Sequence, residues 1–176
     1  MNNKKPELKI TILVRMFPNI VQTYVLNHIL CLKDAGANTL IVAERDPKQH
    51  EIHPRVLENK LIEETLYIDT EKDNLLKQVP SIPLFNHRYL SALLKTLFSN
   101  IWSKYGIVYG VKTLIRLQVR SNHDIDIIHS HSLFSSYDYL FLKDYFSIPL
   151  TTTFHGLVPK NVKMLDDSKI KAVLDP

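Results

Sequence analysis

The sequence predicts an α/β protein with a Rossmann-like, doubly wound and mostly parallel sheet. Two observations carry this prediction: short apolar or β-branched runs alternate with segments of helix length, and polar residues follow several of the runs. The runs are continuous rather than alternating, which is typical of parallel strands buried on both faces. With 176 residues, 45% of them hydrophobic and 23% charged, the chain has the size and composition of one globular domain.

The first 45 residues predict a strand–helix–strand unit. Leu8–Val14 is the expected first strand and Thr39–Ala43 the second. Asn19 is a candidate N-cap for the helix between them, and Gly36 follows that helix as a C′ glycine should. The helix is expected because apolar residues recur at helical spacing: Val21, Val25, Ile29 and Leu32. This unit is the usual opening of a Rossmann-like sheet.

The middle of the chain is less regular. Glu44–Lys60 is polar and predicted to be irregular, and Thr65–Ile68 is expected to form a short third strand. Tyr89–Phe98 and Val108–Val119 are predicted to be helical. The sequence contains no repeat or linker, so a single domain is expected over residues 1–176.

The last strand–helix–strand unit places polar residues at strand ends. Ile125–Ile128 and Leu150–Phe154 are the expected strands, and Ser135–Phe146 is long enough for the helix between them. Ligands of open α/β sheets bind at the carboxyl ends of the strands. The residues expected at this edge form the candidate site: His129, Ser130, His131, His155 and Gly156.

These histidines suggest metal binding, but we expect no metal site. His129 and His131 share a face if the strand continues that far, and His155 could supply a third imidazole. However, no cysteine or carboxylate stands in a matching motif, and histidines at strand ends commonly only form hydrogen bonds. No cofactor is expected either, because Arg15–Thr23, where a dinucleotide-binding fold has its glycine-rich loop, contains no glycine.

The charge distribution suggests an anionic partner. The chain has a net charge of +4, yet residues 74–123 contain seven lysines and arginines and no acid, so the rest has a net charge of −3. One interpretation is a surface that binds an anionic bilayer. The alternative is a set of core-facing helices with a solvated basic face, and no motif favours nucleic acid. The predicted membrane-surface residues are Arg88, Lys95, Lys104, Lys112, Arg116 and Arg120.

The expected location is the cytoplasm, with peripheral association at the inner face of the membrane. The chain has no apolar segment of membrane-spanning length, and its start is too polar for a signal peptide. The single cysteine, Cys31, excludes an internal disulfide and suits a reducing compartment. We expect Cys31 to be a small core residue of the first helix.

Three stretches together resemble a known family. They are Phe17-Pro18 followed by Gln22-Thr23-Tyr24, Asp126-Ile-Ile-His-Ser-His131, and Ile148-Pro-Leu-Thr-Thr-Thr-Phe-His-Gly156. In this order and spacing they resemble the N-terminal, acceptor-side domain of retaining glycosyltransferases with the GT-B architecture, in glycosyltransferase family 4. The closest resemblance is to exopolysaccharide, colanic-acid-like and capsule transferases of bacteria. Val21-Gln22-Thr23 departs from the glycine-rich or Ser-Glu-Thr loop of many relatives.

The resemblance implies a sugar transferase that uses a nucleotide sugar as co-substrate and a polysaccharide or lipid-linked acceptor. It implies that His155 faces the cleft and contacts the donor sugar or its phosphate, as the catalytic residue. The other implied substrate-binding residues are Arg15, Phe17, Gln22, Thr23, His129, His131 and Gly156. Transfer with retention by front-face attack requires no metal and no pair of carboxylates from this domain.

In that family the donor is held mainly by a C-terminal domain, which has no counterpart in these 176 residues. The expectation is therefore an acceptor-binding half that is inactive alone and needs the second domain in cis or in trans. Two alternatives stay open: a membrane-associated adaptor that pairs with a separate donor-domain chain, and a small-molecule or metal-binding α/β module.

Overall fold

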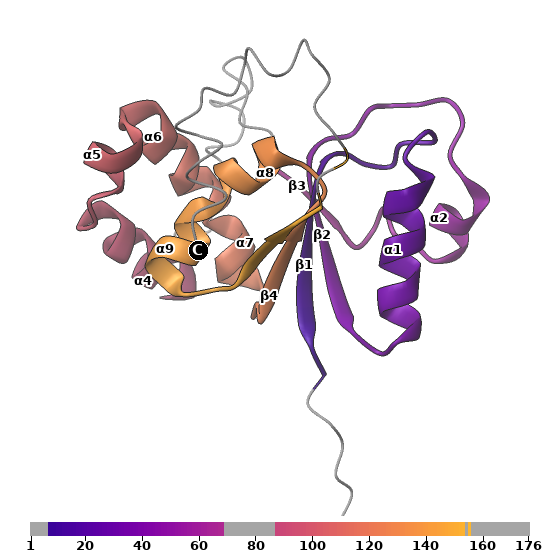
Figure 1. The fold of residues 1–176 in the computed structure, drawn as a ribbon, viewed down its shortest axis with the longest axis horizontal. Coiled ribbons are helices and arrows are strands. Elements are labelled where there is room, and N and C mark those ends of the chain that lie inside the picture. The colour runs from indigo at the N-terminus through magenta and orange to yellow at the C-terminus, as the bar shows by residue number, and fades with distance from the viewer. Residues whose placement is uncertain (1–6, 69–86, 154, 156–176) are drawn as a thin grey trace, which may run out of the picture.

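The computed structural model describes residues 7–68, 87–153 and 155, and within them one parallel sheet forms the centre of the molecule (Figure 1). Its strands are ordered β3-β2-β1-β4-β5, and every neighbouring pair is parallel. The strands are β1 (Lys9–Met16), β2 (Asn38–Arg45), β3 (Thr65–Tyr67), β4 (Ile127–Ser130) and β5 (Leu150–Thr152). The predicted α/β fold class is confirmed.

Helices cover both faces of this sheet. Helices α1 and α2 lie on one side, and helices α4 to α9 lie on the other (Figure 1). The helices are α1 (Thr23–Asp34), α2 (Pro54–Glu58), α4 (His87–Leu97), α5 (Ile101–Tyr105), α6 (Ile107–Arg116), α7 (Gln118–Asn122), α8 (Leu133–Asp138) and α9 (Leu140–Phe146).

Each face of the sheet has its own hydrophobic core, as the alternation of side chains along β1 requires. Ile12 packs with Ile29 of α1 in one cluster, whereas Leu13 packs with Phe141 of α9 in the other. All four side chains are at most 1% exposed. A strand buried on both faces explains why β1 reads as a continuous apolar run.

The C-terminus of α1 ends as predicted, but its N-terminus does not. Gly36 has a φ of +82° and its N–H donates to the Lys33 carbonyl, while the Ala37 N–H donates to the Leu32 carbonyl. These two bonds form a Schellman motif, which favours glycine at the left-handed position. Asn19 was predicted as the N-cap, but its Oδ1 accepts from Val21 N in the preceding turn, and the helix begins at Thr23.

Two other local predictions are wrong. Glu44–Lys60 was expected to be irregular but contains α2, which has Pro54 at its first position and the His53 ring as acceptor for the Arg55 N–H. The single helix predicted over Ser135–Phe146 is two helices, α8 and α9, separated at Tyr139. The ring of Tyr139 is 2% exposed, so the break is part of the core.

The strand order creates a topological switch point between β1 and β4. The chain leaves β1 toward α1 on one face and leaves β4 toward α8 on the other, so the two connections diverge above neighbouring strand ends. The His131 N–H donates to the Leu13 carbonyl at 3.1 Å, which fixes the end of β4 beside β1. In open α/β sheets the crevice above such a point is where ligands bind.

Candidate functional site

Four histidine side chains meet at the carboxyl edge of the sheet, and we call them the histidine cluster (His28, His129, His131 and His155). Nδ1 of His28 lies 3.0 Å from Nε2 of His131. Nδ1 of His131 lies 3.3 Å from Nε2 of His155. The ring of His129 is 4.7 Å from that of His28 and 4.9 Å from that of His131, between centroids.

The backbone explains how residues so far apart in sequence come together. Side chains two residues apart leave a strand on the same face, so His129 and His131 both point toward the side covered by α1. On α1, Tyr24 and His28 are four residues apart and share one side of the helix. The Tyr24 ring lies 4.3 Å from the His155 ring and 5.9 Å from the His131 ring, between centroids.

Two threonines of the β5 segment hold the His129 ring. Nδ1 of His129 lies 2.9 Å from the Thr151 hydroxyl, and Nε2 lies 3.0 Å from the Thr153 hydroxyl. The pairing of His129 with Thr151 across the parallel β4–β5 ladder places the first of these contacts. Both ring nitrogens of His129 therefore have a hydrogen-bond partner.

The cluster is electrostatically unusual. Burial is the largest cause that lowers the pKa of His131 to about 4, followed by the neighbouring His129, His28 and His155 in that order. Burial also lowers the pKa of His129, with smaller contributions from His28 and His155. The pKa of His28 is lowered by burial alone. These three imidazoles are therefore neutral at pH 7, and each offers one N–H donor and one lone pair.

The structure brings only some of the predicted site residues together. His129, His131 and His155 are adjacent, as expected, and Gln22 and Thr23 precede Tyr24 at the start of α1. Gly156 lies outside the described residues.

Arg15 and Phe17 lie apart from the histidine cluster. Arg15 is on the other face of β1, with its guanidinium over the Phe134 ring and its Nε 3.6 Å from a Glu44 carboxylate oxygen. The Phe17 side chain is 3% exposed and packs in the core beneath α1. Burial is the main cause that raises the pKa of Glu44.

Sequence reasoning missed His28, Tyr24, Thr151 and Thr153 as parts of the site. His28 stands four residues after Tyr24, a helical spacing that was a usable signal. The threonines could have been found from the register of two parallel strands. Together, three neutral imidazoles, a 42% exposed tyrosine ring and two hydroxyls suit a ligand with many hydroxyl groups or a metal ion.

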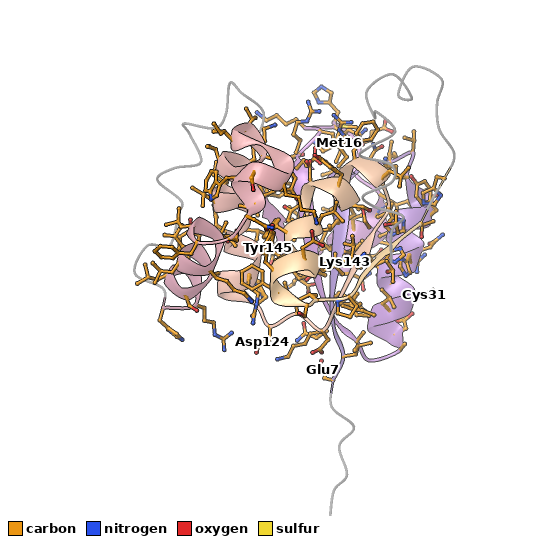
Figure 2. The ribbon with its side chains drawn as sticks, turned by 60° about the vertical axis from the view of Figure 1, so that its left-hand side comes forward. Glu7, Met16, Cys31, Asp124, Lys143 and Tyr145 are labelled. Atoms are coloured by element: carbon orange, nitrogen blue, oxygen red, sulfur yellow. The ribbon has the colours of Figure 1, made fainter. Side chains whose placement is uncertain are left out.

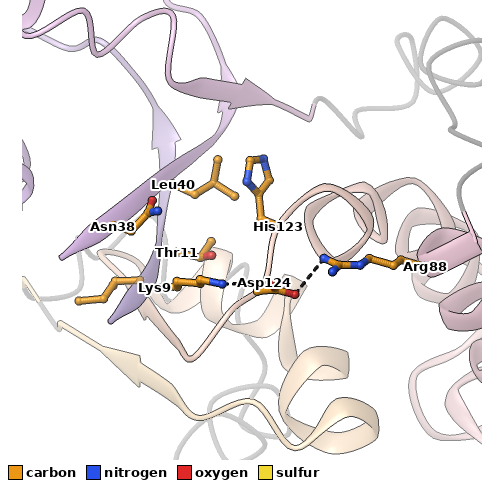
Figure 3. Close-up of a pocket in the computed structure, with 8 residues that line it drawn as sticks. Lys9, Thr11, Asn38, Leu40, Arg88, His123 and Asp124 are labelled. Carbon is orange, nitrogen blue, oxygen red and sulfur yellow. Dashed lines mark hydrogen bonds and ion pairs between the residues drawn. The ribbon is translucent and has the colours of Figure 1, made fainter. Parts of the chain in front are cut away.

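One hollow among the described residues lies at the opposite edge of the sheet. Figure 2 shows Met16, the last residue of β1, at one end of the molecule and Asp124 at the other. The hollow has a volume of about 180 Å³, and Asp124 lies at its wall between Lys9 and Arg88, at 3.0 and 2.9 Å (Figure 3). Because these charges pair with one another at the amino ends of the strands, we interpret this hollow as structural.

Not all of the six residues predicted to form a membrane-binding surface are exposed. Arg116 is 2% exposed, and its Nη2 lies 2.7 Å from Asp138, so its assignment to the membrane surface is wrong. Lys104 pairs with Asp144 at 2.7 Å, and the ammonium of Lys95 lies over the Phe146 ring. Lysines and arginines are rarely buried unless paired, and the partner of Arg116 comes from a distant part of the chain.

Exposed apolar side chains accompany the remaining basic residues. On α4 they form one stripe, Leu90, Leu94 and Leu97, each nearly half exposed, and Phe98 beyond the helix is 88% exposed. In the described part of the chain, no helix has both the length and the apolarity needed to cross a bilayer. Cys31 was predicted to be a core residue, but it lies on the exposed side of α1 (Figure 2).

The chain was compared with protein families, curated proteins and solved structures. No family model, curated protein or solved structure matches this chain.

Proposed function

We propose that this protein is the acceptor-binding domain of a retaining glycosyltransferase, which moves a sugar from a nucleotide sugar to a polysaccharide or lipid-linked acceptor. The observation that supports this most is the contact among Tyr24, His131 and His155. Each belongs to a different one of the three stretches that resemble glycosyltransferase family 4. Stretches that are far apart in the sequence thus supply neighbouring side chains at the switch point of the sheet.

The side chains fit this chemistry. Neutral imidazoles donate and accept hydrogen bonds, as sugar hydroxyls require, and the exposed ring of Tyr24 can pack against the C–H face of a sugar. The first N–H groups of α1 and the Thr23 hydroxyl can donate to a phosphate oxygen. In the proposed reaction the acceptor oxygen bonds to the anomeric carbon as the bond to the donor phosphate breaks. The acceptor proton passes to that phosphate oxygen, with His155 stabilising the charge that develops there.

The test is a transfer assay on the protein isolated from its own cells with an antibody to this domain. Labelled nucleotide sugars are offered one at a time with an envelope fraction as acceptor. We expect transfer from one donor and a decrease in kcat of roughly 100-fold for His155→Gln, a usual effect of losing one such hydrogen bond. The exposed His87 is the matched control, and His87→Gln should be fully active. Absence of transfer from every donor would contradict the proposal.

A second function, peripheral binding to an anionic membrane, is favoured by the apolar stripe of α4. Leu94 is 48% exposed next to the exposed Lys95, in a segment without acids. An apolar face beside basic residues is typical of helices that lie in a bilayer interface. Co-sedimentation with vesicles should decrease on addition of salt and in Leu94→Ser and Lys95→Gln. Vesicle binding that is reduced neither by salt nor by either substitution would exclude this function.

A further inference from the structure

The histidine cluster has the composition of a metal site, which the sequence led us to discount. Among the described residues, His28, His129 and His131 each place one ring nitrogen within 4.8 Å of the other two. Zinc binds histidine nitrogens at about 2.0–2.1 Å with tetrahedral geometry, so two such nitrogens lie about 3.3 Å apart. The closest pair, Nδ1 of His28 and Nε2 of His131, is 3.0 Å apart.

We propose that His28, His129 and His131 bind one divalent transition-metal ion, of which zinc fits best. Imidazole suits zinc, copper and nickel, whereas magnesium and calcium prefer oxygen ligands, and no carboxylate belongs to this group. The ligand atoms are Nδ1 of His28 and Nε2 of His129 and His131. Three protein ligands leave a fourth position open, as in zinc sites that bind a water or a substrate.

Hydrogen-bond partners are already in place for two of the three ligands. Metal-bound histidines usually donate their second ring N–H to an oxygen or nitrogen that fixes the ring. For His129 that partner is the Thr151 hydroxyl, 2.9 Å from Nδ1. For His131 it is Nε2 of His155, 3.3 Å from Nδ1. His155 therefore orients a ligand and is not one itself.

Forming the site requires one small rearrangement. Nε2 of His129 must exchange the Thr153 hydroxyl, 3.0 Å away, for the metal. The terminal torsion of histidine is broad, so a rotation of the ring can bring this nitrogen closer to the other two.

The alternative is a chain of hydrogen-bonded imidazoles with no metal, because 3.0 Å also fits an N–H···N bond. Calorimetry on the purified chain after chelator treatment separates the two, with zinc chloride as the only ligand. We expect one zinc ion per chain, and with Co²⁺ the visible absorption of a four-coordinate ion. His28→Gln and His131→Gln should weaken zinc binding by more than ~100-fold, and Thr151→Val by roughly 10-fold, as for a residue that only orients a ligand.

His87→Gln is the matched control and should bind zinc as the parent chain does. Circular dichroism without metal establishes that each variant is folded. No saturable zinc binding by the parent chain, or equal binding by a folded His28→Gln variant, would overturn the proposal. The experiment contains no nucleotide sugar, so its result is independent of the proposed glycosyltransferase function.

Discussion

Nδ1 of His28 lies 3.0 Å from Nε2 of His131, although 103 residues separate them in the sequence. One ring comes from the helix that follows β1 and the other from the end of β4, so the contact joins both sides of the switch point. It occupies the ring nitrogens at the centre of the candidate site. The properties of the site therefore depend on the protonation of these two rings.

The first prediction concerns pH. The folded chain does not protonate His131 until the pH reaches about 4, whereas the unfolded chain takes up that proton near pH 6.5. The contribution of His131 to the free energy of unfolding should therefore be fully present above pH 6.5 and decrease as the pH falls toward 4. The expected loss is on the order of 1 kcal/mol, because the half-exposed ring is partly screened by solvent. Urea unfolding of chelator-treated protein measures it, and His131→Asn should flatten the pH dependence.

The second prediction concerns the ion pair of the buried Arg116 with Asp138, whose side chain is 26% exposed. Arg116→Gln should lower the free energy of unfolding by about 3 kcal/mol, because it leaves the Asp138 carboxylate without its 2.7 Å partner. Lys112→Gln, a change of the same charge on the same helix, should cost less than about 0.5 kcal/mol. Denaturant titration compares the two. Equal effects would mean that Arg116 is a surface residue after all.

The third prediction concerns the contact between α5 and α6. A Cβ on Gly110 would overlap the Trp102 ring, so Gly110→Ala must displace the indole. We expect a loss of about 1–3 kcal/mol in stability, as for other overpacked sites. Trp102 is the only tryptophan of the chain, so its emission spectrum reports the displacement directly. Val111→Ala, at a 43% exposed neighbour, should leave that spectrum unchanged.

Much of the fold could be predicted because each strand is a local pattern. Buried parallel strands are apolar along their whole length. Gly36 marks the end of α1 because the left-handed conformation that ends many helices favours glycine. Pro54 marked the start of α2 as clearly, but the polar composition around it obscured the signal. Helix breaks such as that at Tyr139 depend on tertiary packing and have no comparable mark.

The site could be predicted only where strand ends define it. His129, His131 and His155 follow strands, so the topology places them at one edge. The spacing from Tyr24 places His28 on the same side of α1, but the periodicity of the helix does not specify how that side is rotated above β4. The misassignment of Arg116 has a similar origin, because its partner Asp138 lies in α8, beyond β4.

The central claim is that residues from α1, from β4 and from the chain after β5 form one site. Nuclear Overhauser spectroscopy on ring-labelled protein tests it most directly. We predict cross-peaks between the rings of Tyr24 and His155, whose centroids are 4.3 Å apart, and between those of His28 and His131. The Tyr109–Tyr137 pair in the core, at 5.4 Å, is the internal control. Absence of both predicted cross-peaks in a spectrum that contains the control would contradict the site and the functions proposed for it.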